Sequence, residues 1–94
     1  MNPRKTADIR SSLERKGFKP ANRDHVFYFL HINGRKTQVR TKISHGAREY
    51  SPGLMSIVAS QLHLSNGELA DLLDCPLSED AYISLLQARG ILSA

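Results

Sequence analysis

The first hydrophobic positions of the chain are spaced like one face of a helix. Ile9 and Leu13 lie four residues apart, and Thr6 is of a residue type that caps helix N-termini. Gly17 suits the position just beyond a helix end, where a left-handed backbone is common. The pattern predicts a first helix over residues 6–16.

Two strand-like segments follow, joined by a tight turn. Residues 24–32 are rich in aromatic and β-branched side chains and end at Asn33-Gly34, the strongest short-range signal for a hairpin. Residues 36–43 alternate between polar and β-branched positions, which predicts the returning strand. Ahead of the hairpin, residues 18–21 contain Pro20 and are expected to form at most a short edge strand.

Three further helices are expected in the second half of the chain. Their start signals are Ser51-Pro52, the capping-box sequence Ser65-Asn66-Gly67-Glu68, and Ser78. The hydrophobic residues expected to face the core are Leu54, Ile57, Val58 and Leu62, then Leu69, Leu72 and Leu73, and finally Tyr82, Leu85 and Leu86. The pattern predicts an α+β fold of order α-β-β-β-α in residues 1–64, with a helical hairpin in residues 65–94 packed on the same core as one structural domain.

A two-residue turn also fixes which side chains share a face of the hairpin. It pairs Ile32 with Arg35, Phe29 with Gln38, Phe27 with Arg40, and His25 with Lys42. The apolar face then holds Val26, Tyr28, Leu30, Ile32, Val39 and Ile43, ready to be covered by helices. The opposite face carries His25, Phe27, Phe29, His31, Lys36, Gln38, Arg40 and Lys42. A register slipped by one residue would expose Tyr28 and Leu30 and bury two histidines, so it is disfavoured.

Length and composition exclude several classes of protein. A chain of 94 residues, 40% hydrophobic and 23% charged, fits one folded domain. The longest apolar run, residues 26–30, is far shorter than the ~20 residues of a membrane span, and no apolar stretch follows the basic N-terminus as in a secretory signal. We therefore expect a cytoplasmic protein without a membrane partner, and the pattern leaves its oligomeric state open.

The cations are concentrated in the first half of the chain. Residues 1–50 carry 12 Lys and Arg against four acids, whereas residues 51–94 carry one cation against five acids, and the net charge is +4. A basic half is typical of proteins that bind a polyanion, most often nucleic acid. The alternative is an ordinary solvated surface. On an open sheet face, rings interleaved with cations suit unpaired bases and phosphates, which makes Phe27, Phe29, Lys36, Arg40 and Lys42 the predicted nucleic-acid-binding residues.

His25 is the candidate catalytic residue. A histidine with a near-neutral pKa can take the proton from an RNA 2′-hydroxyl or return one to the leaving oxygen, while a cation such as Lys42 or Arg40 holds the phosphate. The alternative is that His25 fills a strand position or forms a hydrogen bond with Asp24. Spacing alone leaves both open.

Three segments of the chain resemble a known family. In order, GFKPANRDHVFYFL, NGRKTQV and ISHGAREYSPGLMSIVASQLHLS are similar to the HicA-type toxins, small RNA-cleaving proteins with a double-stranded-RNA-binding-like fold. That family has a helix ending in Gly-Phe, a strand entered through Gly-Ser-His, a second strand running into a Pro-x-His loop, and a Gly-x-Leu helix. The resemblance covers residues 9–65. It implies a metal-independent endoribonuclease that acts on RNA, with an antitoxin-like protein partner.

The resemblance also assigns roles to residues. It places the active-site histidine on His25 and the loop histidine on His45, and it matches Gly53-Leu54 to the start of the second helix. Arg23-Asp24 stands where the family has Gly-Ser, so a carboxylate precedes the histidine and can either repel phosphate or hold the imidazole in one tautomer. Asp24 and His45 are therefore auxiliary candidates. Ser44 replaces the loop proline, and the C-terminal tail is longer than such toxins need.

Other functions remain open. The same fold can serve as a non-catalytic module that binds RNA or a protein. The C-terminal hairpin also suggests a helix-turn-helix that associates with DNA, but Glu79 and Asp80 at the start of its second helix oppose phosphate, and Arg89 is its one cation. An acidic hairpin is better suited to cover the core or to bind a basic protein surface, including a second copy of the chain. The histidines lack common metal-ligand spacings and Cys75 is the single cysteine, so no metal or cofactor is predicted.

Overall fold

The computed structural model of the chain describes residues 3–22, 26–44 and 46–93. Its four helices are α1 (Thr6–Arg15), α2 (Pro52–Gln61), α3 (Asn66–Asp74) and α4 (Glu79–Ala88). The main sheet consists of β2 (Phe18–Asn22), β3 (Val26–Ile32) and β4 (Arg35–Ile43), and a second, two-stranded sheet joins β1 (Arg4–Lys5) to β5 (Glu49–Tyr50). The predicted α+β class with a three-stranded antiparallel sheet is confirmed.

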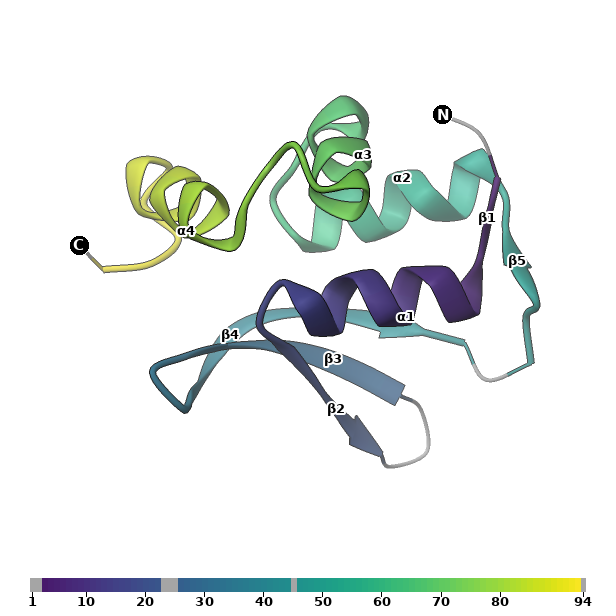
Figure 1. Cartoon of the computed structure of the whole chain (residues 1–94), viewed down its shortest axis with the longest axis horizontal. Coiled ribbons are helices and arrows are strands. Elements are labelled where there is room, and N and C mark those ends of the chain that lie inside the picture. Colours follow the sequence, from purple (N-terminus) through teal and green to yellow (C-terminus); the bar gives the residue numbers. More distant parts are fainter. Residues whose placement is uncertain (1–2, 23–25, 45, 94) are drawn as a thin grey trace.

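The helices lie on one side of the main sheet. Figure 1 shows α1 directly against the sheet, α2 and α3 above α1, and α4 beyond them toward the hairpin end of β3 and β4. The buried residues of the strands, among them Tyr28, Leu30 and Val39, form one hydrophobic core with residues of all four helices. The other face of the sheet has no helix over it in Figure 1.

The start of α1 differs from the sequence-based expectation. Thr6 is not the N-cap: the helix begins at Thr6, and Lys5 precedes it without a side-chain cap. The Thr6 hydroxyl instead donates to the carbonyl of Ala47 at 2.8 Å, and its N–H donates to the carbonyl of Arg48 at 2.9 Å. These bonds tie the helix to the segment before β5. Two-residue strands have no periodic pattern, so the small sheet was not predicted.

The buried face of α2 also differs from the expectation. Leu54 and Ile57 were expected in the core but are 41% and 54% exposed, whereas Met55 and Ala59 are buried. Both stripes of this helix are apolar, so hydrophobic spacing alone could not choose between them, and packing against α3 and β4 decided the outcome. Val58 belongs to the buried stripe, as expected.

The ends of the later helices follow the predicted signals. Ser51 and Ser78 accept hydrogen bonds from the third residue after each of them, and Ser65 and Glu68 form the complete capping box. Gly17, expected just beyond α1, and Gly90, just after α4, have φ angles of +92° and +74°, which are easily adopted without a Cβ.

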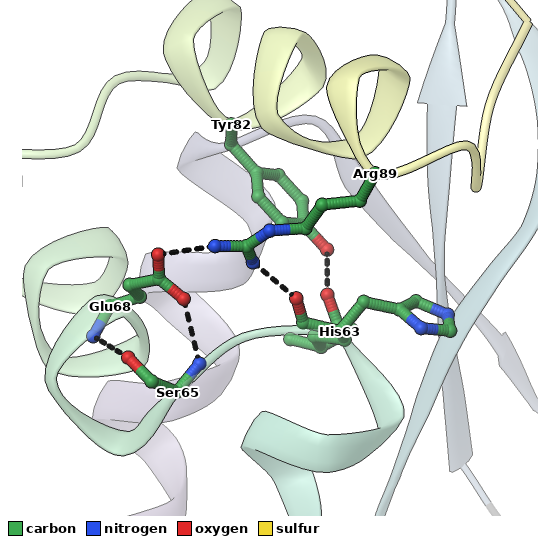
Figure 2. Close-up of polar contacts among 6 residues, drawn as sticks. His63, Ser65, Glu68, Tyr82 and Arg89 are labelled. Atoms are coloured by element: carbon green, nitrogen blue, oxygen red, sulfur yellow. Dashed lines mark hydrogen bonds and ion pairs between the residues drawn. The ribbon is translucent and has the colours of Figure 1, made fainter.

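A polar cluster fixes α4 to the turn between α2 and α3 (Figure 2). The Arg89 guanidinium donates to the Glu68 carboxylate and to the His63 carbonyl, both at 2.6 Å. The hydroxyl of the buried Tyr82 donates to the Leu62 carbonyl at 2.9 Å. The C-terminal helices are thus joined to the rest of the molecule through both apolar burial and hydrogen bonds.

Candidate functional site

The face of the main sheet opposite the helices gathers rings and cations from all three strands. We call it the open face, and it is formed by Lys19 and Ala21 of β2, Phe27, Phe29 and His31 of β3, and Lys36, Gln38, Arg40 and Lys42 of β4. The alternation of buried and exposed positions along β3 and β4 puts these side chains on the side away from the core. All five predicted nucleic-acid-binding residues lie on it.

The pairing of the two hairpin strands differs from the predicted register. Ile32 does pair with Arg35, but Phe29 faces Arg40 rather than Gln38, and Phe27 faces Lys42 rather than Arg40. The expected pair of His25 with Lys42 is therefore wrong. An irregularity between Phe29 and His31 shifts the register by two residues, and a shift of two leaves every side chain on its predicted face.

Ladder rows bring charges and rings together across the sheet. One row runs Lys19, Phe29, Arg40, and the next runs Ala21, Phe27, Lys42. Lys19 was not among the predicted site residues, because β2 was expected as a marginal edge strand. Its place opposite Phe29 gives the open face a cation on each side of the central strand.

The two phenylalanine rings are adjacent and half-buried, and cations lie over them. The Phe27 and Phe29 ring centroids are 6.3 Å apart with their planes inclined by 43°. The Lys36 ammonium lies 4.4 Å from the Phe29 centroid, and the Arg40 guanidinium carbon lies 5.4 Å from the Phe27 centroid and 5.9 Å from that of Phe29. At these distances each cation is attracted to the ring faces.

No carboxylate offsets this charge within the strands. β2, β3 and β4 contain no Asp or Glu. Among the described residues, the ion pairs are Arg4 with Asp74 and Arg89 with Glu68, and neither involves the open face. The face therefore has a positive potential suited to an anionic ligand.

Two shallow hollows flank the Phe27 ring. The first, of about 330 Å³, is lined by Ala21, Phe27, Phe29, Lys36 and Arg40. The second, of about 320 Å³, lies where the open face meets the C-terminal end of α2, and it is lined by Phe27, Gln38, Arg40, Thr41, Lys42 and Gln61. Gln61 was missed at the level of sequence because only the fold brings the end of α2 against β4.

The predicted catalytic residue His25 and its auxiliary candidates Asp24 and His45 lie outside the described residues. Of the other histidines, His31 is half-buried at the end of β3, with its Nδ1 3.0 Å from the Phe29 carbonyl oxygen. Within residues 3–22, 26–44 and 46–93, no group of three or more His, Cys, Asp and Glu side chains could hold a metal ion.

None of the described helices is long and apolar enough to cross a bilayer. The chain matches no family model, no curated protein and no solved structure. Since no similar protein indicates a function, the function is inferred from the residues of the open face.

Proposed function

We propose that the protein binds single-stranded RNA through the open face, as the resemblance to HicA-type toxins also implies. Unpaired bases stack on the exposed parts of the Phe27 and Phe29 rings, and phosphates bind the surrounding cations. In this interaction Lys36 exchanges its contact with the Phe29 ring for a phosphate, which frees the ring face for a base. Arg40 can stay between the rings, since a guanidinium plane also stacks on bases.

One observation carries this proposal: two adjacent rings lie among four cations, with no carboxylate in the three strands, on a sheet face that none of the four described helices covers. The cations are Lys19, Lys36, Arg40 and Lys42. Duplexes offer few exposed base faces to such a surface, so single strands are the favoured ligand. A double-stranded-RNA-binding-like fold, with α1, β2, β3, β4 and α2 as its elements, belongs to the same proposal.

Fluorescence anisotropy with a labelled single-stranded RNA tests the binding. The double variant Lys36→Gln/Lys42→Gln should reduce the magnitude of the negative slope of log K against log salt by about 1.4, because each lost phosphate contact on a single strand removes about 0.7. Phe29→Leu, which keeps apolar bulk but removes the ring, should weaken binding by about 1–3 kcal/mol, the usual contribution of stacking per base.

A charge-matched control separates site binding from general attraction. Arg15→Gln/Arg48→Gln removes the same charge from exposed positions that do not belong to the open face. It should leave the salt slope nearly unchanged. Equal effects of the two double variants, or native affinity in Phe29→Leu, would show that the RNA does not bind at the open face.

The resemblance adds RNA cleavage to the proposal, with His25 as the general base and Asp24 and His45 as auxiliary groups. His25 directly precedes β3, so it is next in sequence to the open-face strand. Induction of the native chain should arrest growth and degrade RNA, and His25→Ala should relieve both while RNA binding persists. If the native chain is harmless and leaves RNA intact, the protein is a binding module of the same fold. Persistent toxicity in His25→Ala excludes this base.

A further inference from the structure

The hollow at the edge of β4 differs from its neighbour in having two carboxamides in its wall. We call this 320 Å³ hollow the amide pocket. Gln61 comes from the last turn of α2 and Gln38 from β4, and both are exposed. The Phe27 ring and the cations Arg40 and Lys42 line the same hollow. Its volume is near the lower limit for small-molecule sites, which fits a single base with its sugar rather than a large cofactor.

The orientation of the Gln61 carboxamide is fixed by β4. Its Oε1 accepts hydrogen bonds from the Thr41 hydroxyl at 2.6 Å and from the Lys42 backbone N–H at 3.2 Å. A backbone N–H can only donate, so the atom facing it must be the oxygen. The Nε2 of Gln61, with its two N–H donors, is the atom left for a ligand.

The orientation of Gln38 is fixed in the opposite sense. Its Nε2 donates to the carbonyl of Ile91, in the segment after α4, at 2.8 Å. A carbonyl can only accept, so the amide nitrogen must face it, and the Oε1 of Gln38 is the atom left for a ligand. The C-terminal segment, which extends beyond the part of the chain that resembles HicA-type toxins, thereby orients one wall of the pocket.

We propose that the amide pocket recognises one RNA base by its edge, an inference that rests on the proposed RNA binding. The base packs against Phe27, while the Gln61 Nε2 donates to an acceptor on its edge and the Gln38 Oε1 accepts from a donor. Every unpaired base carries both kinds of group, but at positions that differ from base to base. A fixed donor and a fixed acceptor therefore discriminate between bases.

Among the described residues, the neighbouring hollow has no carboxamide in its wall. The described part of its wall is formed by Ala21, the two phenylalanine rings and two cations, and it shares Phe27 and Arg40 with the amide pocket. Rings and cations accept any base and its phosphate. The open face thus binds successive nucleotides, one without selection and one, at the amide pocket, with selection.

The test compares affinities of the full chain for the hexamers of uridylate, cytidylate and adenylate by anisotropy. The native chain should bind the preferred hexamer at least about fivefold more tightly than the weakest, the discrimination expected from about one edge hydrogen bond. In Gln61→Glu, one carboxylate oxygen keeps the contacts with Thr41 and Lys42 while the other replaces the donor. This variant should change the ratio of the affinities for these two hexamers by at least about fivefold. Gln38→Met should bring the ratio to within about twofold of unity.

Ser60→Glu is the matched control, because it adds the same charge at an exposed position one residue from Gln61 that does not line the pocket. It should weaken all three hexamers equally and keep their order. A native chain without preference, or a preference unchanged in both Gln61→Glu and Gln38→Met, overturns the inference and leaves RNA binding intact. If the native chain binds none of the hexamers, or if Phe29→Leu binds them as the native chain does, the proposed function fails and the inference fails with it.

Discussion

At the scale of residues, Thr37 forms hydrogen bonds at the irregularity in the pairing of β3 with β4. This irregularity determines which side chains of the open face lie opposite each other. Its hydroxyl donates to the Leu30 carbonyl at 2.8 Å and accepts from the Val39 N–H at 3.2 Å, where β4 has more residues than the facing part of β3. Thr37→Val keeps the shape but leaves both backbone groups without this partner, and should lower the free energy of unfolding by about 1–3 kcal/mol. Urea denaturation measures this. Thr37→Ser, which keeps the hydroxyl, is the control, and equal stability of the two variants would contradict the role of the hydroxyl.

The same residue explains what the sequence could and could not predict about the site. Alternation along the strands correctly predicted that Phe27, Phe29 and Arg40 share a face, because a register shift of two residues preserves faces. It could not predict which side chains stand opposite each other, since the shift depends on the contact between Thr37 and the Leu30 carbonyl. Gln61 had no local signal at all, because its role depends on where α2 ends relative to β4.

At the scale of elements, the cap of α3 is coupled to α4 through a single carboxylate. Glu68 accepts from the Ser65 N–H at 2.8 Å and from Arg89 at 2.6 Å. The hydrogen bond from Arg89, and next that from the Ser65 backbone, lower the Glu68 pKa to about 2. Since the folded-state pKa is depressed, this contribution to stability is present above the ordinary value near 4.5 and is lost as the pH falls toward 2.

Glu68→Gln tests this coupling, because glutamine can retain the capping box but cannot form the ion pair with Arg89. Thermal melts between pH 2 and 6 should show the native chain more stable near pH 6, with the difference in Tm shrinking as the pH falls below about 4.5. Other carboxylates, such as Asp74 beside Arg4, contribute equally to both chains and cancel in the difference. Asp71→Asn, at an exposed position of the same helix, is the control, and a Tm difference independent of pH would contradict the ion pair's role.

The elements also differ in how far the sequence predicts them. Capping signals fixed the starts of α2, α3 and α4, because the serine side chains act on backbone groups within three residues. The buried face of α2 could not be predicted, since its two apolar stripes are equivalent until the partner surface is known. The strands β1 and β5 depend on the bonds of Thr6 to the segment before β5, which are contacts distant in sequence.

At the scale of the whole molecule, the C-terminal helices belong to the same core as the sheet. Tyr82 and Leu86 of α4 are fully buried, and the Tyr82 ring stacks on Phe18 of β2 with centroids 6.0 Å apart. Lys16, at the end of α1, is buried and donates to the Leu77 carbonyl just before α4. Because α4 contributes buried side chains to the core and Ile91 after it orients Gln38, this C-terminal part of the chain stabilises the fold and also positions a wall of the amide pocket.

A chain ending at Leu77 tests this dependence. The truncation removes Tyr82 and Leu86, and each fully buried side chain of this size contributes about 1.5–3 kcal/mol. Their joint loss is comparable to the whole free energy of unfolding of a small domain, so the truncated chain should lack a cooperative thermal transition by circular dichroism. The point variant Leu86→Ala should keep a cooperative transition with a stability lower by about 2–5 kcal/mol, which ties the effect to burial rather than to chain length. If the truncated chain melts as sharply as the full one and binds RNA with the same base preference, residues 1–77 form a self-sufficient unit and α4 has neither role.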